Sequence, residues 1–94
     1  MKKIEIAAMQ KYANAAHQDW LRAKIAVTEA LIKGDRREEL AAREEEKTCW
    51  YIRYGMLMTL RAVGANLELD ALSLEIDREL DALDEQLKKV WGIN

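Results

Sequence analysis

The sequence predicts an all-α protein in which three long antiparallel helices form a helical bundle, and three observations lead to this fold. No proline interrupts the 94 residues. Glycines at Gly34, Gly64 and Gly92 end long segments. Each segment carries apolar residues at alternating steps of three and four, the spacing of one helical face. We therefore expect a single domain, residues 1–94, with helices at about residues 3–33, 35–63 and 67–91, and we expect a second copy to complete the bundle.

The first predicted helix carries a stripe of mostly small apolar residues along one side. These residues are Ile6, Met9, Ala13, Ala16, Trp20, Ala23, Val27 and Ala30. Because most of them are alanine, a partner helix can approach this side closely, and Trp20 is its one large side chain. Lys33 in the last turn and Gly34 after it both favour a helix end at this point.

The second predicted helix begins at Asp35 and has two unlike halves. Glu38 stands three residues after Asp35, so the pair is a variant of the capping box. Residues 35–47 are mostly charged, whereas residues 49–63 are apolar on nearly every side, which is typical of a buried helix. Gly55 costs about 1 kcal/mol relative to alanine in a helix interior. Either another backbone approaches closely at Gly55, or the glycine is simply tolerated.

The third predicted helix starts between Leu67 and Asp70 and combines a regular apolar stripe with an acidic outer face. The stripe contains Leu69, Leu72, Ile76, Leu80, Leu83, Leu87 and Val90. Residues 65–87 carry eight acidic groups and one arginine, a net charge of −7, whereas residues 1–34 carry +3. The acidic face is either a solvated surface or a docking surface for a protein partner with a basic surface. The partner-binding residues that we assign to it are Glu75, Asp77, Asp81, Asp84 and Glu85.

Composition excludes several functional classes. The net charge of −2 predicts no general affinity for nucleic acid or anionic membranes. A single cysteine, Cys49, excludes an internal disulfide framework and gives no sign of export. The most apolar stretch, residues 49–63, is too short to span a bilayer and contains two arginines. We expect a cytoplasmic protein with no membrane partner and no direct nucleic-acid binding.

No pattern of residues predicts a catalytic or metal site, so we expect no enzymatic activity, no metal and no cofactor. His17 is the only histidine, and Asn14 stands where the Glu-x-x-His pair of a di-iron bundle needs glutamate. One histidine and one cysteine do not make a structural zinc site within one chain. Cys49 has no base near it in sequence, and we interpret it as a small core residue.

Two alternative functions stay open. Arginines inside a helical bundle can bind a dicarboxylate, and the length and three-helix pattern are similar to those of the short all-α chorismate mutases. In that alternative Arg53 and Arg61 would line a closed pocket, although the surrounding charges of that family are missing from the other helices. The second alternative is a phage-type inhibitor whose acidic helix competes with nucleic acid for the basic groove of a host enzyme.

An excess of apolar surface predicts self-association. Two neighbouring helices do not cover residues 49–63 together with the further apolar residues of the first helix, which are Ile4, Leu21, Ile25 and Ile32. We expect a homodimer or higher oligomer that associates through Trp20, Trp50, Tyr54 and Leu57, with a monomeric bundle as the alternative. The expected function is that of a non-enzymatic adaptor, regulator or inhibitor, acting by protein–protein interaction through the acidic helix and the apolar dimer surface.

Overall fold

The computed structural model describes residues 2–92, apart from the side chain of Ile4, and this part of the chain holds three α-helices and no strand. α1 spans Lys3–Lys33, α2 spans Arg36–Ala62 and α3 spans Ala71–Val90. The all-α class is confirmed, and the first two helices lie within one residue of their expected bounds. No helix in residues 2–92 is both long and apolar enough to cross a membrane.

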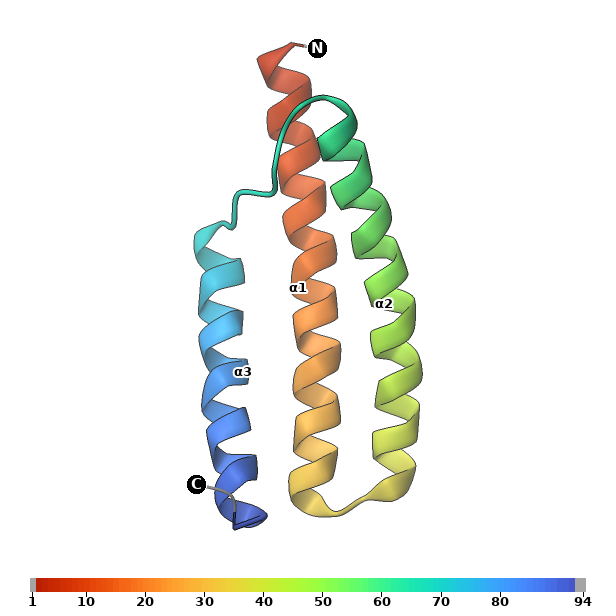
Figure 1. The fold of residues 1–94 in the computed structure, drawn as a ribbon, viewed down its shortest axis with the longest axis vertical. Coiled ribbons are helices and arrows are strands. Elements are labelled where there is room, and N and C mark those ends of the chain that lie inside the picture. Colours follow the sequence, from red (N-terminus) through yellow and green to blue (C-terminus); the bar gives the residue numbers. More distant parts are fainter. Residues whose placement is uncertain (1, 93–94) are drawn as a thin grey trace.

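The three helices lie side by side in a flattened layer with α1 in the middle (Figure 1). α1 packs against α2 on one side and α3 on the other, and α2 and α3 do not pack against each other anywhere in residues 2–92. Successive helices are antiparallel, as expected, so α3 runs parallel to α1. The arrangement is therefore an open bundle, and its completion by a second copy stays a prediction.

The turn between α1 and α2 follows from local chemistry. Gly34 adopts the left-handed conformation with φ 73°, which glycine tolerates best. The Asp35 carboxylate then accepts the backbone N–H of Glu38 at 3.0 Å and caps α2. The Glu38 carboxylate pairs with Lys33 Nζ at 3.4 Å, so half of the expected capping box is present. A two-residue turn of this kind forces α2 to return along α1.

α3 begins at Ala71, later than the expected start near residue 67. The Asp70 carboxylate accepts the backbone N–H of Ser73 at 2.8 Å and fixes the first turn there. The preceding residues are held against α1, because Gln10 Nε2 donates to the Asn66 carbonyl at 2.7 Å. Gln10 Oε1 also accepts the backbone N–H of Glu68 at 2.9 Å. These backbone groups are bound to α1 and cannot form a helical turn.

The core between α1 and α3 is small and centres on Leu21, Ile76 and Leu80. Leu21 is only 2% exposed, and Ile25 packs against the same cluster. Our expectation that Leu21 and Ile25 lie on an uncovered surface is therefore wrong, because α3 covers them. Ile32 is half-buried, and the side chain of Ile4 lies outside the described residues.

The apolar half of α2 is largely uncovered in the single chain. Cys49 and Leu60 are buried, whereas Trp50, Tyr54 and Ile52 are 41%, 47% and 55% exposed. The expectation of a buried helix is wrong for one chain, because α2 has one neighbouring helix rather than two. Gly55 is exposed, and apart from the backbone of its own helix and its two chain neighbours, no heavy atom lies within 4 Å of the place where a Cβ would lie. Within residues 2–92 no other backbone approaches it, which favours the tolerated glycine.

Candidate interaction groove

An open groove lies on one face of α1, between α2 and α3, and we call it the interaction groove. It exists because α2 and α3 do not pack together over this face in residues 2–92. At one end it forms a hollow of about 290 Å³ to which all three helices contribute. The hollow is lined by Lys24 and Leu31 of α1, Arg43 and Glu46 of α2, and Asp84 and Leu87 of α3. Charged and apolar side chains are thus mixed along the groove.

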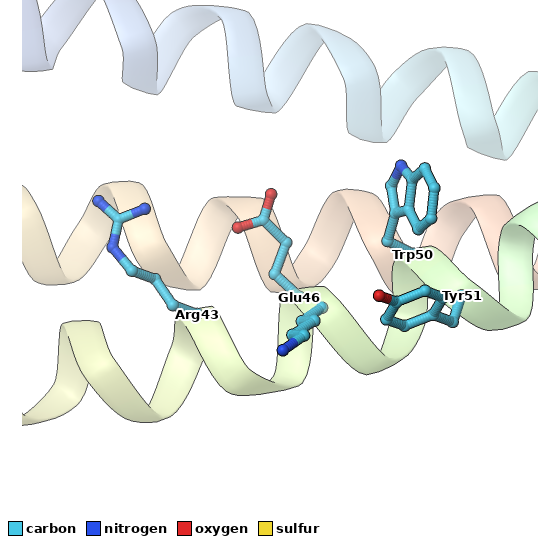
Figure 2. A pocket seen from close by; sticks show the side chains of 5 residues that line it. Arg43, Glu46, Trp50 and Tyr51 are labelled. Atoms are coloured by element: carbon cyan, nitrogen blue, oxygen red, sulfur yellow. The ribbon is translucent and has the colours of Figure 1, made fainter.

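The α2 edge of the groove is aromatic. Figure 2 shows Arg43, Glu46 and Trp50 pointing from α2 across α1 toward α3. The indole of Trp50 stacks on Tyr54, with ring centroids 5.3 Å apart and planes 14° apart. Tyr54 and Leu57 line the next hollow along the same edge. Three of the residues that we assigned to self-association, Trp50, Tyr54 and Leu57, therefore form one row on this edge.

The floor of the groove contains a stacked cation and histidine cluster. Arg53 Nε–H donates to His17 Nδ1 at 2.9 Å, and the Arg53 guanidinium lies 4.5 Å from the ring centroid of Trp20. Lys24 Nζ lies 4.5 Å from the same ring. Cations over an indole face are attracted to it electrostatically. Trp20, the fourth residue assigned to self-association, is therefore half-buried beneath two cations rather than presented at the surface.

Burial and charge together keep His17 neutral. The side chain is 7% exposed. Burial lowers the pKa of His17 below its ordinary value of 6.5, and the positive charge of Arg53 lowers that pKa further. The carboxylates of Asp77 and Asp70 oppose this shift but do not reverse it. A neutral His17 can accept the Arg53 hydrogen bond, whereas a protonated one cannot.

We expect the fold to lose stability as the pH falls below about 6.5. Because the pKa of His17 is lowered in the folded state, the unfolded chain binds more protons in this range, and stability rises with pH. One proton gives a slope of at most about 1.4 kcal/mol per pH unit. Urea unfolding between pH 5 and 7.5 measures this slope, with His17→Gln as the matched variant that cannot titrate. An equal slope in the two proteins would rule out His17 as the cause.

The acidic residues of α3 do not form one surface. Asp77, Asp81 and Asp84 follow one another at steps of four and three, so they share one side of α3, and we call them the acidic row. Asp84 Oδ1 lies 3.4 Å from the Thr28 hydroxyl, and the charge of Asp77 acts on His17, which places the row beside the groove. Glu75 lies on another side of α3, whereas Glu85 follows Asp81 by four residues and is exposed. Of the five residues assigned to a partner, Asp77 and Asp84 therefore border the groove, and Asp81 stands between them on the same side of the helix.

The α2 side of the groove is basic. Arg43 Nε–H donates to the buried Glu39 carboxylate at 2.8 Å. Arg53 and Arg61 line a hollow of about 390 Å³, in which Arg53 is half-buried and Arg61 is exposed. This hollow is an open groove, whereas the chorismate-mutase-like alternative needs the two arginines in a closed pocket. The hollow therefore gives that alternative no support, and enzymatic activity is not tested by it.

Cys49 of α2 is buried and lines a second hollow with Ala23 and Ala26 of α1, in agreement with its interpretation as a core residue. Burial raises the pKa of its thiol, and the charge of Glu45 raises it further. A thiol with a raised pKa is mostly protonated and is a poor nucleophile. Among residues 2–92, no three side chains of histidine, cysteine, aspartate or glutamate converge where a metal ion would sit.

No protein-family model, curated protein or solved structure matches the chain. Its function is therefore inferred from the groove and from the residues that line it.

Two of the residues that form the groove, Arg43 and Glu46, were not predicted from the sequence. A signal for them was present, because Arg43, Glu46 and Trp50 follow one another at steps of three and four. Their position in a charged stretch concealed it, since such a stretch is usually solvated. Lys24 was also overlooked as a groove residue, although it stands one turn after Trp20.

Proposed function

We propose that this chain acts in the cytoplasm without catalysis, as a small helical adaptor, regulator or inhibitor that binds a protein partner through the interaction groove. The observation that carries the proposal is the exposed aromatic edge of the groove, where Trp50 and Tyr54 stack on each other with nearly half of each surface in solvent. Tryptophan and tyrosine are enriched at protein interfaces, where they supply large contact areas. A single chain leaves this surface without a covering helix.

The charge beside the groove defines the chemistry of the partner. Three carboxylates line up along α3, so a basic surface next to an apolar one suits this groove. Exposed charges attract such a partner over distances of about 8–10 Å at physiological salt, and added salt screens the attraction. The proposal therefore includes binding that weakens as salt rises.

The proposal is tested by capture of partners from the cells in which the chain is made. Tagged wild type is compared with Tyr54→Ala at the groove edge and with Tyr12→Ala, a matched control on α1 whose side chain is 64% exposed. Loss of an interface tyrosine commonly costs about 2 kcal/mol, so we expect at least tenfold less of the bound protein with Tyr54→Ala. We expect the yield with Tyr12→Ala to equal that of wild type.

Two outcomes would overturn the groove as the binding surface. The first is the same bound proteins in equal yield from wild type and Tyr54→Ala. The second is equal loss from Tyr54→Ala and Tyr12→Ala while circular dichroism shows both variants to be fully helical.

A further inference from the structure

We propose that the protein bound in the interaction groove is a second copy of this chain, related to the first by a two-fold axis parallel to the helices. This inference rests on the proposed function and names its partner. It follows from the charges on the two sides of the groove, which are opposite in sign and match in position.

The two walls of the groove carry opposite charge. The α2 wall presents Arg43 and Arg61, and Arg53 of the same helix reaches the floor, whereas the α3 wall presents the acidic row. Two carboxylates of α2 are exceptions. Glu39 is shared by Arg36 and Arg43, which together carry one more charge than it does. The charge of Glu46 is offset by Lys24 and Lys47, which line the same hollows. A purely basic partner would be attracted by one wall and repelled by the other. A partner with one basic and one acidic wall satisfies both.

The opposite charges also lie at matching levels along the helices. Arg43 and Asp84 line one hollow, so they face each other across the groove toward the C-terminal end of α3. Nearer the other end, Arg53 hydrogen-bonds to His17, and the charge of Asp77 acts on the same imidazole. Each of these arginines therefore has a carboxylate at about its own level on the opposite wall.

Only one of the two face-to-face arrangements brings these opposite charges together. A two-fold axis parallel to the helices keeps every residue at its level and exchanges the two sides of the layer. It places α2 of one copy over α3 of the other, with Arg43 facing Asp84 and Arg53 facing Asp77. An axis across the helices places α2 over α2 and α3 over α3, so that like charges oppose each other.

The face is large enough for a stable dimer. The chain extends 50 Å along the helices and 23 Å across the layer, dimensions that accommodate an interface of the usual size. Stable interfaces bury about 800 Å² on each partner. A copy laid on this face would also cover Trp50 and Tyr54, the aromatic side chains that the single chain leaves exposed.

A charge swap tests both the partner and the axis. In the proposed dimer, position 43 of each copy faces position 84 of the other copy. Arg43→Glu alone therefore places a carboxylate against a carboxylate at both contacts, and Asp84→Arg alone places a cation against a cation at both contacts. We expect wild type to sediment at twice the chain mass of 10.8 kDa and each variant to self-associate at least tenfold more weakly. An equimolar mixture of the two variants should regain the double mass, because every facing pair is again of opposite charge.

Matched controls and a second measurement keep the test independent of folding. Arg37→Glu and Glu75→Arg make similar charge changes at exposed positions that line no part of the groove, and we expect both to remain dimeric. Circular dichroism checks that each variant is helical, because Arg43→Glu also removes the ion pair with Glu39. For unaltered wild type, we expect dimer dissociation to increase at least severalfold between 0.05 and 0.5 M salt.

Each alternative result has a definite meaning. A wild-type chain that stays monomeric at high concentration overturns this inference, whereas capture of a different protein that depends on Tyr54 would leave the proposed function standing. A dimer that persists in both variants, or variants that do not reassociate on mixing, overturns the parallel axis. The mixing experiment also distinguishes contacts between two copies from pairing of Arg43 with Asp84 inside one chain. Mixing the two variants restores opposite charges only between chains, so it cannot restore a pair that forms within one chain.

Discussion

Replacing Leu21 with alanine is expected to lower the free energy of unfolding by about 3–4 kcal/mol, in the middle of the range for buried leucines. Leu21 is 2% exposed and packs against Ile76 and Leu80, the core that joins α1 to α3. Within residues 2–92, α3 packs against no helix other than α1. The substitution therefore weakens the one helix–helix contact that holds α3. A loss of this size is a large fraction of the free energy of unfolding of a small domain.

Urea unfolding followed by circular dichroism measures this effect. The matched control is Leu40→Ala, at a helical position on α2 where the side chain is 50% exposed, and we expect a change below about 1 kcal/mol there. If the two substitutions cost the same, then α3 does not depend on Leu21 and the α1–α3 core is wrongly assigned.

Replacing Asn14 with alanine should cost about 2–4 kcal/mol, because this one side chain satisfies polar groups on three residues at and before the start of α3, as well as the Gln10 carbonyl of its own helix. Asn14 Oδ1 accepts the backbone N–H of Asp70 at 2.9 Å and the hydroxyl of Ser73 at 2.8 Å. Asn14 Nδ2 donates to the carbonyl of Glu68 at 2.7 Å. Ser73 is fully buried, so its hydroxyl would lose one of its partners where no water replaces it.

Hydrogen exchange combined with urea unfolding checks this prediction. We expect faster exchange at the amides of residues 66–73 in Asn14→Ala, since the segment leading into α3 loses its attachment to α1. The control is Gln86→Ala on the exposed side of α3, which should change neither exchange nor stability measurably. Unchanged exchange at the amide of Asp70 in Asn14→Ala would show that Asn14 does not hold this segment.

Local signals predicted the first two helices well, and long-range contacts decided where the third begins. Gly34 and Asp35 act within one turn of chain, so their effect is readable from the sequence. The late start of α3 depends on Gln10 and Asn14, which are more than fifty residues away. Gln10, Asn14 and Gln18 follow one another at steps of four, which indicated a polar face on α1. Nothing in the sequence showed which segment of the chain would pack against that face.

The arrangement of the helices could not be predicted from the apolar stripes alone. A stripe shows that a helix face is covered, but it does not say by which neighbour. The two-residue turn at Gly34 is so short that α2 must pack against α1. The eight residues from Val63 to Asp70 are long enough for α3 to pack on either helix. Because α3 packs on α1, the aromatic row of α2 is left uncovered and the groove opens.

The candidate site was predicted in its aromatic part and only partly in its charged part. Trp50, Tyr54 and Leu57 were grouped by their spacing on one helix, and they do line one edge of the groove. The acidic residues were grouped by composition, which does not distinguish Asp77 at the groove from Glu75 outside it. The contact between Arg53 and His17 joins two helices and had no signature in either segment.

Footprinting of the aromatic side chains by hydroxyl radicals, at low and high protein concentration, tests most directly whether the groove is the interaction surface. In dilute protein we expect strong oxidation of Trp50, Tyr54 and Tyr12, which are all exposed in the single chain. In concentrated protein we expect Trp50 and Tyr54 to become protected severalfold, while oxidation of Tyr12 stays unchanged. Equal oxidation of Trp50 and Tyr54 at every concentration, or protection of Tyr12 in their place, would contradict the groove as the surface through which two copies of this chain associate.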